Sequence, residues 1–247
     1  VRWDEFFAGS QFSPETKSKL KRFWSKHSKR FDIYGGDKKN SPFLASHPSL
    51  ISLPCYQTIF TGESVDGNDN SLDLVEEHTW LDKTVRSLGL AKEQAAVFAS
   101  WETIKLAVSN EPDKIMINAG FDKGTQTPEI KTISRIQQDD LPPWKDCRWD
   151  KYTLGMAESY VRKIKPRVTY ISLTDSDDAA HTGVFSDYIE AIERFDVWLD
   201  GFIEYLETDD YYSQNTHVVI TTDHGRGLDE EWVDHNSDIP YAKFIWL

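Results

Sequence analysis

Two short segments, Asp177-x-x-x-His181 and Asp223-His224-Gly225, each lie where an apolar run typical of a β-strand is expected to give way to a loop, and His235 comes soon after them. Carboxylate oxygens and imidazole nitrogens are the ligands that hold zinc-like metals. Because the carboxyl ends of parallel strands face the ligand-binding crevice of an open α/β sheet, both segments are expected at one sheet edge. Strand-end Asp and His also serve as turn and cap residues. Three such groups in this order favour a two-metal hydrolytic site.

Helical and extended patterns alternate through most of the chain, which favours a layered α/β fold over an all-β sandwich or a helical bundle. The clearest helix carries apolar residues at intervals of three and four, namely Tyr188, Ile192, Phe195, Leu199, Phe202 and Leu206. Further helices are predicted over 14–31, from just after Ser52 to Thr61, and over 72–88 and 152–164. Strands are predicted over 95–99, 114–117, 167–173, 216–222 and 242–247. The strand over 216–222 is rich in β-branched residues and is expected to be buried on both faces.

Composition excludes two kinds of partner. The 41 acidic and 28 basic side chains give a net charge of −13, which opposes the attraction to phosphate backbones that nucleic-acid binders need. No apolar run approaches the roughly 20 residues that span a bilayer. We therefore expect no bulk binding of nucleic acid and no transmembrane segment.

No domain boundary is evident along the 247 residues, and one domain over 1–247 is predicted. The stretch over 122–150 is polar and contains Pro128, Pro142 and Pro143. Long stretches without strong periodicity often form lids or inserted subdomains. We predict such a lid or insertion over 122–150.

The ordered set Ser52-Leu53-Pro54, Thr61-Gly62, Asp177-x-x-x-His181, Asp223-His224-Gly225 and His235 resembles the alkaline phosphatase superfamily of metallo-phosphohydrolases. That superfamily includes nucleotide pyrophosphatase/phosphodiesterase and sulfatase branches, and the chain is most similar to a bacterial group of alkaline-phosphatase-like proteins. The resemblance spans nearly the whole chain. It implies a three-layer α/β/α sandwich with a mostly parallel central sheet.

The resemblance also implies a role for each matching residue. Asp177, His181 and His235 match the ligands of one metal, and Asp223 and His224 match ligands of the second. Ser52 matches the nucleophile. The implied cofactors are two divalent ions, zinc in the first place, with manganese or calcium as alternatives.

Serine is preferred to cysteine as the nucleophile. Cys55 lies three residues too late in the motif, and Pro54-Cys55-Tyr56 departs from the Pro-Ser-Arg that follows the oxidised residue of sulfatases. A metal-activated Ser52 and a covalent phosphoseryl intermediate are therefore expected. Cys55 and Cys147 are interpreted as free thiols, with one disulfide as the alternative.

Two further positions are candidates for substrate binding. The resemblance implies that Asn68 or Asn70 supplies an amide donor to the substrate, as an Asn after the nucleophile helix does in the phosphodiesterase branch, although a turn or cap residue is an equal alternative. Arg226 follows Gly225 closely enough to reach a bound anion.

One ligand of the superfamily pattern is missing from the sequence. The second metal also takes an Asp from the end of the first strand, and this chain begins at Val1-Arg2-Trp3, as though that Asp came just before. We therefore expect that the native N-terminal strand and a C-terminal piece are absent. Without that Asp the second metal would be held weakly.

The sequence predicts a metal-dependent hydrolase of phosphate mono- or diesters. A phosphoryl or phosphoalkyl transferase or mutase of the same fold is one alternative, and a non-catalytic binding module with an incomplete metal site is another. By family analogy we expect a periplasmic or secreted protein that acts on a small-molecule or headgroup phosphate ester. Neither the substrate nor the oligomeric state can be read from the sequence.

Overall fold

The computed structural model describes residues 1–7, 18–35 and 43–247. The chain divides into two compact units. Unit 1 comprises Val1–Cys55 and Ser176–Leu247, and unit 2 comprises Tyr56–Asp175. The single domain expected over 1–247 and the missing terminal pieces stay predictions.

The helices, in chain order, are α1 (Trp3–Phe6), α2 (Ser52–Thr61), α3 (Trp80–Leu88), α4 (Pro128–Ile136), α5 (Asp150–Ile164), α6 (Asp175–His181) and α7 (Phe185–Thr208). The strands are β1 (Ala95–Ala99), β2 (Met116–Ala119) and β3 (Val168–Ser172). Short π- or 3₁₀-helical turns are η1 (Phe23–His27), η2 (Ser28–Arg30), η3 (Lys92–Gln94), η4 (Glu102–Leu106), η5 (Pro112–Lys114) and η6 (Asp229–Val233).

The three strands of unit 2 form a parallel sheet in the order β2-β1-β3. In the register, Val97 of the central strand pairs with Ile117 on one side and Tyr170 on the other. All five residues of β1 are buried, as a continuous apolar run predicts for a central parallel strand. The predicted α/β class with a parallel sheet is confirmed.

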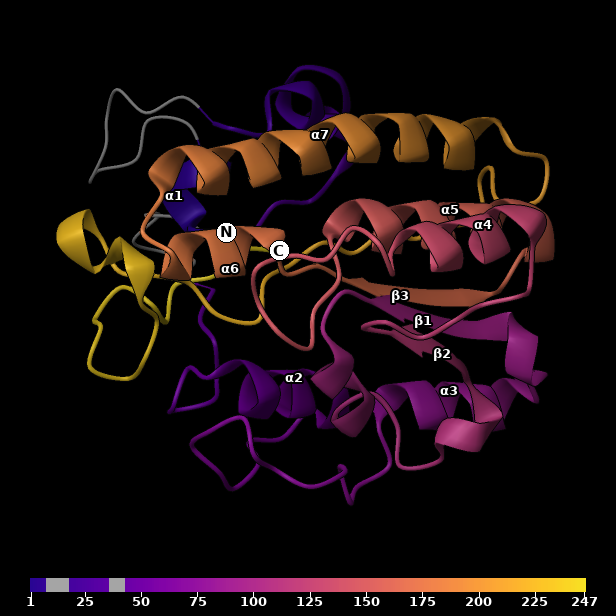
Figure 1. The fold of residues 1–247 in the computed structure, drawn as a ribbon, viewed down its shortest axis with the longest axis horizontal. Coiled ribbons are helices and arrows are strands. Elements are labelled where there is room, and N and C mark those ends of the chain that lie inside the picture. Colours follow the sequence, from indigo (N-terminus) through magenta and orange to yellow (C-terminus); the bar gives the residue numbers. More distant parts are fainter. Residues whose placement is uncertain (8–17, 36–42) are drawn as a thin grey trace. The chain divides into compact units, whose positions relative to one another are not determined.

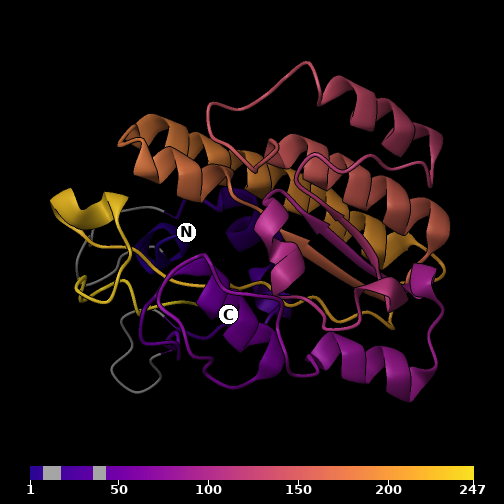
Figure 2. The ribbon, with the colours of Figure 1, turned by 60° about the horizontal axis from the view of Figure 1, so that its bottom comes forward.

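Helices cover both faces of this sheet. Figure 1 shows α4 and α5 over one face and α3 over the other, and Figure 2 shows the same arrangement after a rotation. Phe98 of β1 packs against Met156 and Tyr160 of α5, and its ring centroid lies 5.4 Å from that of Tyr160. On the opposite face the Phe60 ring meets Tyr170 edge-on at 4.7 Å. Unit 2 by itself therefore has three layers.

Helix α3 begins later than the sequence pattern predicts. Thr79 is its N-cap, and the Thr79 side chain and Asp82 form a capping box in which each accepts the other's backbone N–H. The Thr79 hydroxyl also donates to the carbonyl of Val108. This cap places the start of α3 at Trp80, so the predicted start at 72 is wrong. The predicted end of the helix before Gly89, which has φ +58°, is confirmed.

The core of unit 1 lies under α7. Phe6 of α1 stacks on Trp246 with centroids 4.0 Å apart, and Tyr188 and Ile192 of α7 belong to the same buried cluster. Asp196 of α7 accepts the backbone N–H groups of Arg22 and Phe23 at 2.7 and 2.9 Å. The longest helix thus anchors the segment around η1 through both apolar and polar contacts.

Two predicted strands of unit 1 do not form among the residues that the structure describes. Residues 216–222 belong to no strand of the described chain, and Val219 is 73% exposed, so the expected burial on both faces is wrong. Within residues 1–7, 18–35 and 43–247, residues 242–247 form isolated antiparallel bridges instead of a strand, from Phe244 to Leu44 and from Trp246 to Gly35. A β-branched sequence favours an extended backbone, but a strand needs a hydrogen-bonding partner that local sequence does not specify.

Other predicted features have separate outcomes. The helix expected over 14–31, with Ser13 as N-cap, begins outside the described residues, and its described part contains η1 and η2. The stretch over 122–150 contains α4, and its role as a lid stays a prediction. Cys55 and Cys147 are buried and not joined by a disulfide, as interpreted from the sequence. Among the described residues, no helix has the length and apolar character that crossing a membrane requires.

Candidate active site

Ser52, the predicted nucleophile, is the first residue of α2. Its Oγ lies 3.2 Å from Nε2 of His224, within the same unit. The backbone N–H groups at a helix start carry partial positive charge, which favours an anion nearby. The structure therefore places a serine hydroxyl beside one predicted metal ligand and at the positive end of a helix.

Asp177 and His181 lie on α6, where the sequence predicted a loop. A spacing of four residues puts two side chains on the same face of a helix. Accordingly, Oδ2 of Asp177 lies 3.3 Å from Nε2 of His181. The His181 side chain is 45% exposed. A helix explains this geometry better than the predicted loop, since it fixes the spacing of the two ligand atoms.

His224 and His235 stack face to face with ring centroids 3.7 Å apart and an interplanar angle of 8°. Each Nδ1 lies next to a backbone carbonyl, that of Gly225 at 2.9 Å for His224 and that of Leu50 at 2.7 Å for His235. An Nδ1–H that donates to a carbonyl leaves Nε2 as the free acceptor, the usual arrangement of a metal-binding histidine. Both rings are thereby oriented with Nε2 toward the cluster.

Leu50, whose backbone carbonyl is hydrogen-bonded to Nδ1 of His235, has a left-handed backbone conformation with φ +55°. Such a conformation costs about 1–2 kcal/mol for a residue with a Cβ and tends to persist where the surroundings enforce it. Leu50 is buried, and it lies two residues before Ser52. Sequence reasoning missed this contact because a backbone carbonyl leaves no signature in the residue type.

The donor atoms of the predicted ligands converge in two groups. In the first group, Nε2 of His181 lies 3.1 Å from Nε2 of His235 and 3.3 Å from Oδ2 of Asp177. In the second group, Nε2 of His224 lies 3.3 Å from Oδ2 of Asp223. Two ligands of a tetrahedral zinc ion, bound at about 2.0–2.1 Å, stand roughly 3.3 Å apart. The donor set thus fits divalent ions of the zinc type.

The two groups adjoin one another. Asp177, His224 and His235 offer ligand atoms that all lie within 4.8 Å of each other. In paired-metal enzymes the ions themselves stand about 3.5–4 Å apart. These three side chains come from both groups and lie close enough to hold one ion together, so a pair of ions stays a prediction.

The two carboxyl groups have opposite electrostatic surroundings. Burial by itself raises the pKa of Asp177, but the Arg226 guanidinium and the hydrogen bond from His181 outweigh burial and hold that pKa well below its usual range. Burial and the adjacent Asp177 raise the pKa of Asp223 to about 6. Divalent cations would offset the repulsion between these carboxylates.

Burial also governs the histidines. It lowers the pKa of His224 to about 4, and burial together with the neighbouring His224 lowers that of His235 to about 4. Both imidazoles are therefore neutral at pH 7. Neutral imidazole is the form that binds a metal ion.

The two predicted substrate-binding residues are placed differently. The Arg226 side chain is 2% exposed and donates hydrogen bonds to Asp177 and to the carbonyl of Val233. Asn68 belongs to unit 2 and is exposed. Their roles in substrate binding stay predictions.

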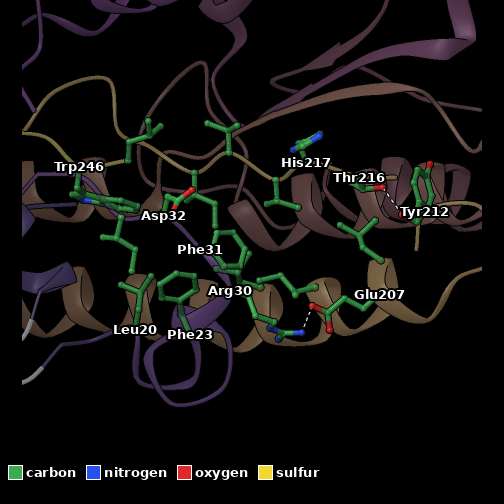
Figure 3. Close-up of a pocket in the computed structure, with 18 of the residues that line it drawn as sticks. Leu20, Phe23, Arg30, Phe31, Asp32, Glu207, Tyr212, Thr216, His217 and Trp246 are labelled. Carbon is green, nitrogen blue, oxygen red and sulfur yellow. Dashed lines mark hydrogen bonds and ion pairs between the residues drawn. The ribbon is translucent and has the colours of Figure 1, made fainter. Parts of the chain in front are cut away.

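A cavity of about 380 Å³ lies elsewhere in unit 1 (Figure 3). Aromatic and aliphatic side chains line most of it, and Arg30 forms an ion pair with Glu207 at its rim. Neither Ser52 nor any of the candidate metal ligands lines this cavity. The candidate site is thus distinct from the cavity that Figure 3 shows.

Comparisons with known proteins give two matches, each over part of the chain. Residues 146–241 match the model of the Metalloenzyme superfamily, a range that contains all five predicted metal ligands. The chain is 38% identical over 60 residues to a 2,3-bisphosphoglycerate-independent phosphoglycerate mutase of Haloquadratum walsbyi. That similarity covers 24% of this chain and 11% of the mutase, so the chain matches about a tenth of that relative's length.

Proposed function

We propose that this protein hydrolyses phosphate mono- or diesters with a serine nucleophile and two divalent metal ions, and the match of residues 146–241 to the Metalloenzyme superfamily model supports this proposal. The superfamily match and the similarity to a mutase support a metal-dependent phosphoryl-transfer enzyme. The superfamily implies divalent metal ions. The observation that carries the finer proposal is the contact between Ser52 Oγ and His224 Nε2, which sets a hydroxyl beside the ligand cluster.

In the proposed site, Asp177, His181 and His235 hold one ion, and Asp223 and His224 contribute to the second. Divalent ions held there would act as Lewis acids that stabilise negative charge on the reacting oxygens. Zinc suits these nitrogen and oxygen donors, and manganese is an alternative. The roles of Asn68 and Arg226 as substrate ligands are not needed for this proposal.

Ser52 supplies the nucleophile. Its Oγ forms a bond to phosphorus as the bond from phosphorus to the ester oxygen breaks, and the departing alcohol acquires a proton. Water then attacks the phosphoseryl group, the bond from Oγ to phosphorus breaks, and Ser52 regains its proton. A monoester substrate thereby releases phosphate, and a diester releases a phosphate monoester. The N-terminus of α2 favours the negatively charged group during both steps.

The experiment compares the wild-type chain with Ser52→Ala and with the control Ser186→Ala, which changes an exposed serine of α7. Turnover of p-nitrophenyl phosphate and bis(p-nitrophenyl) phosphate is measured with added zinc or manganese. Loss of a covalent nucleophile lowers kcat by about 10³-fold or more. Full metal-dependent activity of Ser52→Ala would refute the nucleophile assignment.

A transferase or mutase is the second candidate, because the similar protein from Haloquadratum walsbyi is a phosphoglycerate mutase. Such an enzyme passes the phosphoryl group from the serine to an alcohol rather than to water. Turnover in the presence of glycerol separates the two reactions. Phosphate as the main product supports the hydrolase, and glycerol phosphate as the main product supports the transferase.

Two further expectations accompany the proposal. A non-catalytic binding module would retain ion binding without turnover of any phosphate ester. A periplasmic or secreted location stays a prediction that rests on the family resemblance.

A further inference from the structure

Arg226 is a deeply buried charged side chain that contacts the candidate ligand Asp177. It is 2% exposed, and guanidinium groups stay protonated in proteins. A buried charge is tolerated only where it is paired and hydrogen-bonded. The contacts of Arg226 therefore describe a specific structural task.

Three contacts define that task. Nη2 donates to the Asp177 carboxylate and, at 3.0 Å, to the Asp177 backbone carbonyl. Nη1 donates to the carbonyl of Val233 at 2.8 Å. Both terminal nitrogens are thus occupied by protein oxygens.

These contacts join all three segments that supply candidate ligands. Arg226 itself follows Asp223 and His224, Asp177 lies on α6, and Val233 lies two residues before His235. A planar guanidinium fixes the direction of its hydrogen bonds, which a lysine ammonium does not. One side chain therefore links α6, the turn after Asp223 and the loop before His235.

The contact with Asp177 holds a candidate ligand at two points, because the guanidinium donates to both the carboxylate and the backbone carbonyl of that residue. A group that orients a ligand in this manner commonly changes metal affinity by 10–100-fold when it is removed.

We infer that Arg226 is a positioning residue for the metal ligands and does not bind the substrate anion. This inference rests on the proposed function, because it concerns the same ligand set. It assigns to Arg226 the alignment of Asp177 and of the loop that carries His235. The substrate-binding role suggested by the sequence would instead require a guanidinium nitrogen directed toward the substrate.

The test uses Arg226→Met and Arg226→Lys, with Arg194→Met as the control. Arg194 lies on α7, is half-exposed and pairs with Glu190 one turn away. The affinity for Mn²⁺ alone is measured by competition with a chelating dye. KM and kcat for p-nitrophenyl phosphate are then measured at saturating Mn²⁺.

A positioning role predicts that Arg226→Met weakens Mn²⁺ binding by about 10–100-fold, while KM at saturating Mn²⁺ stays within about twofold of the wild type. The Mn²⁺ affinity of Arg226→Lys should lie between those of the wild type and Arg226→Met, and the affinity of Arg194→Met should match that of the wild type. An unchanged Mn²⁺ affinity would overturn the inference. So would a KM increase of about tenfold or more at saturating Mn²⁺, because that pattern marks a substrate ligand.

Circular dichroism establishes that each variant is folded, and the lysine variant, which keeps a positive charge beside Asp177, decides the matter if the methionine variant does not fold. Failure of the proposed function gives a different result. A wild-type chain that binds no Mn²⁺ contradicts the proposed function, whereas a wild type and Arg226 variants that bind it equally contradict only the inference.

Discussion

Gly225 connects the Asp223-His224 pair to the rest of unit 1 by a close backbone approach. Its N–H donates to the carbonyl of Ala242 at 2.7 Å. A Cβ at this position would lie 2.4 Å from the Phe244 carbonyl oxygen and 2.9 Å from that of Ala242. Ordinary contacts between carbon and oxygen begin near about 3.3 Å, so Gly225→Ala requires a backbone shift of about 1 Å.

The expected result of Gly225→Ala follows from the position of its neighbours. A shift of this size displaces His224 and Arg226, which flank Gly225 in the sequence. Misplacement of catalytic groups by about 1 Å can lower activity by about 100-fold, which equals roughly 2.7 kcal/mol of transition-state stabilisation. We expect a loss of that size in kcat/KM, together with weaker ion binding.

Gly201→Ala is a matched control for this substitution. Gly201 lies within α7, and a Cβ added there would meet nothing within 4 Å. Because alanine favours a helix over glycine, this variant should gain about 0.5–1 kcal/mol of stability without a change in activity. The assays are steady-state turnover of p-nitrophenyl phosphate, Mn²⁺ titration and urea unfolding. Wild-type turnover and Mn²⁺ affinity in Gly225→Ala would refute the view that this turn positions the ligands.

Two further predictions concern other buried groups. Burial and the adjacent Asp175 raise the pKa of Asp150 from 3.8 to about 8. Between these two pH values the folded chain keeps a proton on Asp150 that the unfolded chain has lost. The free energy of unfolding therefore falls as the pH rises through this range. Asp150→Asn should therefore flatten the dependence of Tm on pH between about 5 and 8, and an unchanged slope would contradict this assignment. Burial raises the pKa of the Cys55 thiol far above its ordinary range, and Cys147 is buried as well. Both should react with iodoacetamide much more slowly in the folded than in the urea-unfolded protein, as mass spectrometry would show, and rapid labelling of the native chain would be inconsistent with the structure.

The sequence predicted the parts of the fold that depend on local pattern. The apolar run over 95–99 became a buried strand, and the periodic residues from Tyr188 to Leu206 lie on one long helix. In both cases the spacing of apolar residues determines which face is buried. The start of α3 was missed because the capping box at Thr79 outweighed the apolar pattern before it.

Pairing between distant segments was beyond the sequence pattern. The β-branched run over 216–222 satisfies the requirements of a strand locally, yet it belongs to no strand of the described chain. Hydrogen bonding between strands depends on what lies beside them, which propensity does not encode.

The composition of the candidate site was more predictable than its connections. Ser52 and the five Asp and His residues were predicted from their order and from the family resemblance, and the structure brings their polar atoms to within hydrogen-bonding or ligand spacing. The carbonyls of Leu50 and Val233 could not be predicted, since any residue type carries a backbone carbonyl. These carbonyls orient His235 and Arg226.

The central claim is that Asp177, His181 and His235 hold one divalent ion and that Asp223 and His224 help to hold a second. Anomalous diffraction from crystals of the chain grown with zinc tests it most directly. The account predicts one peak about 2.0–2.2 Å from the ligand atoms of the first group and another beside the second group. Zinc peaks confined to other side chains, or none among these five residues, would contradict the account.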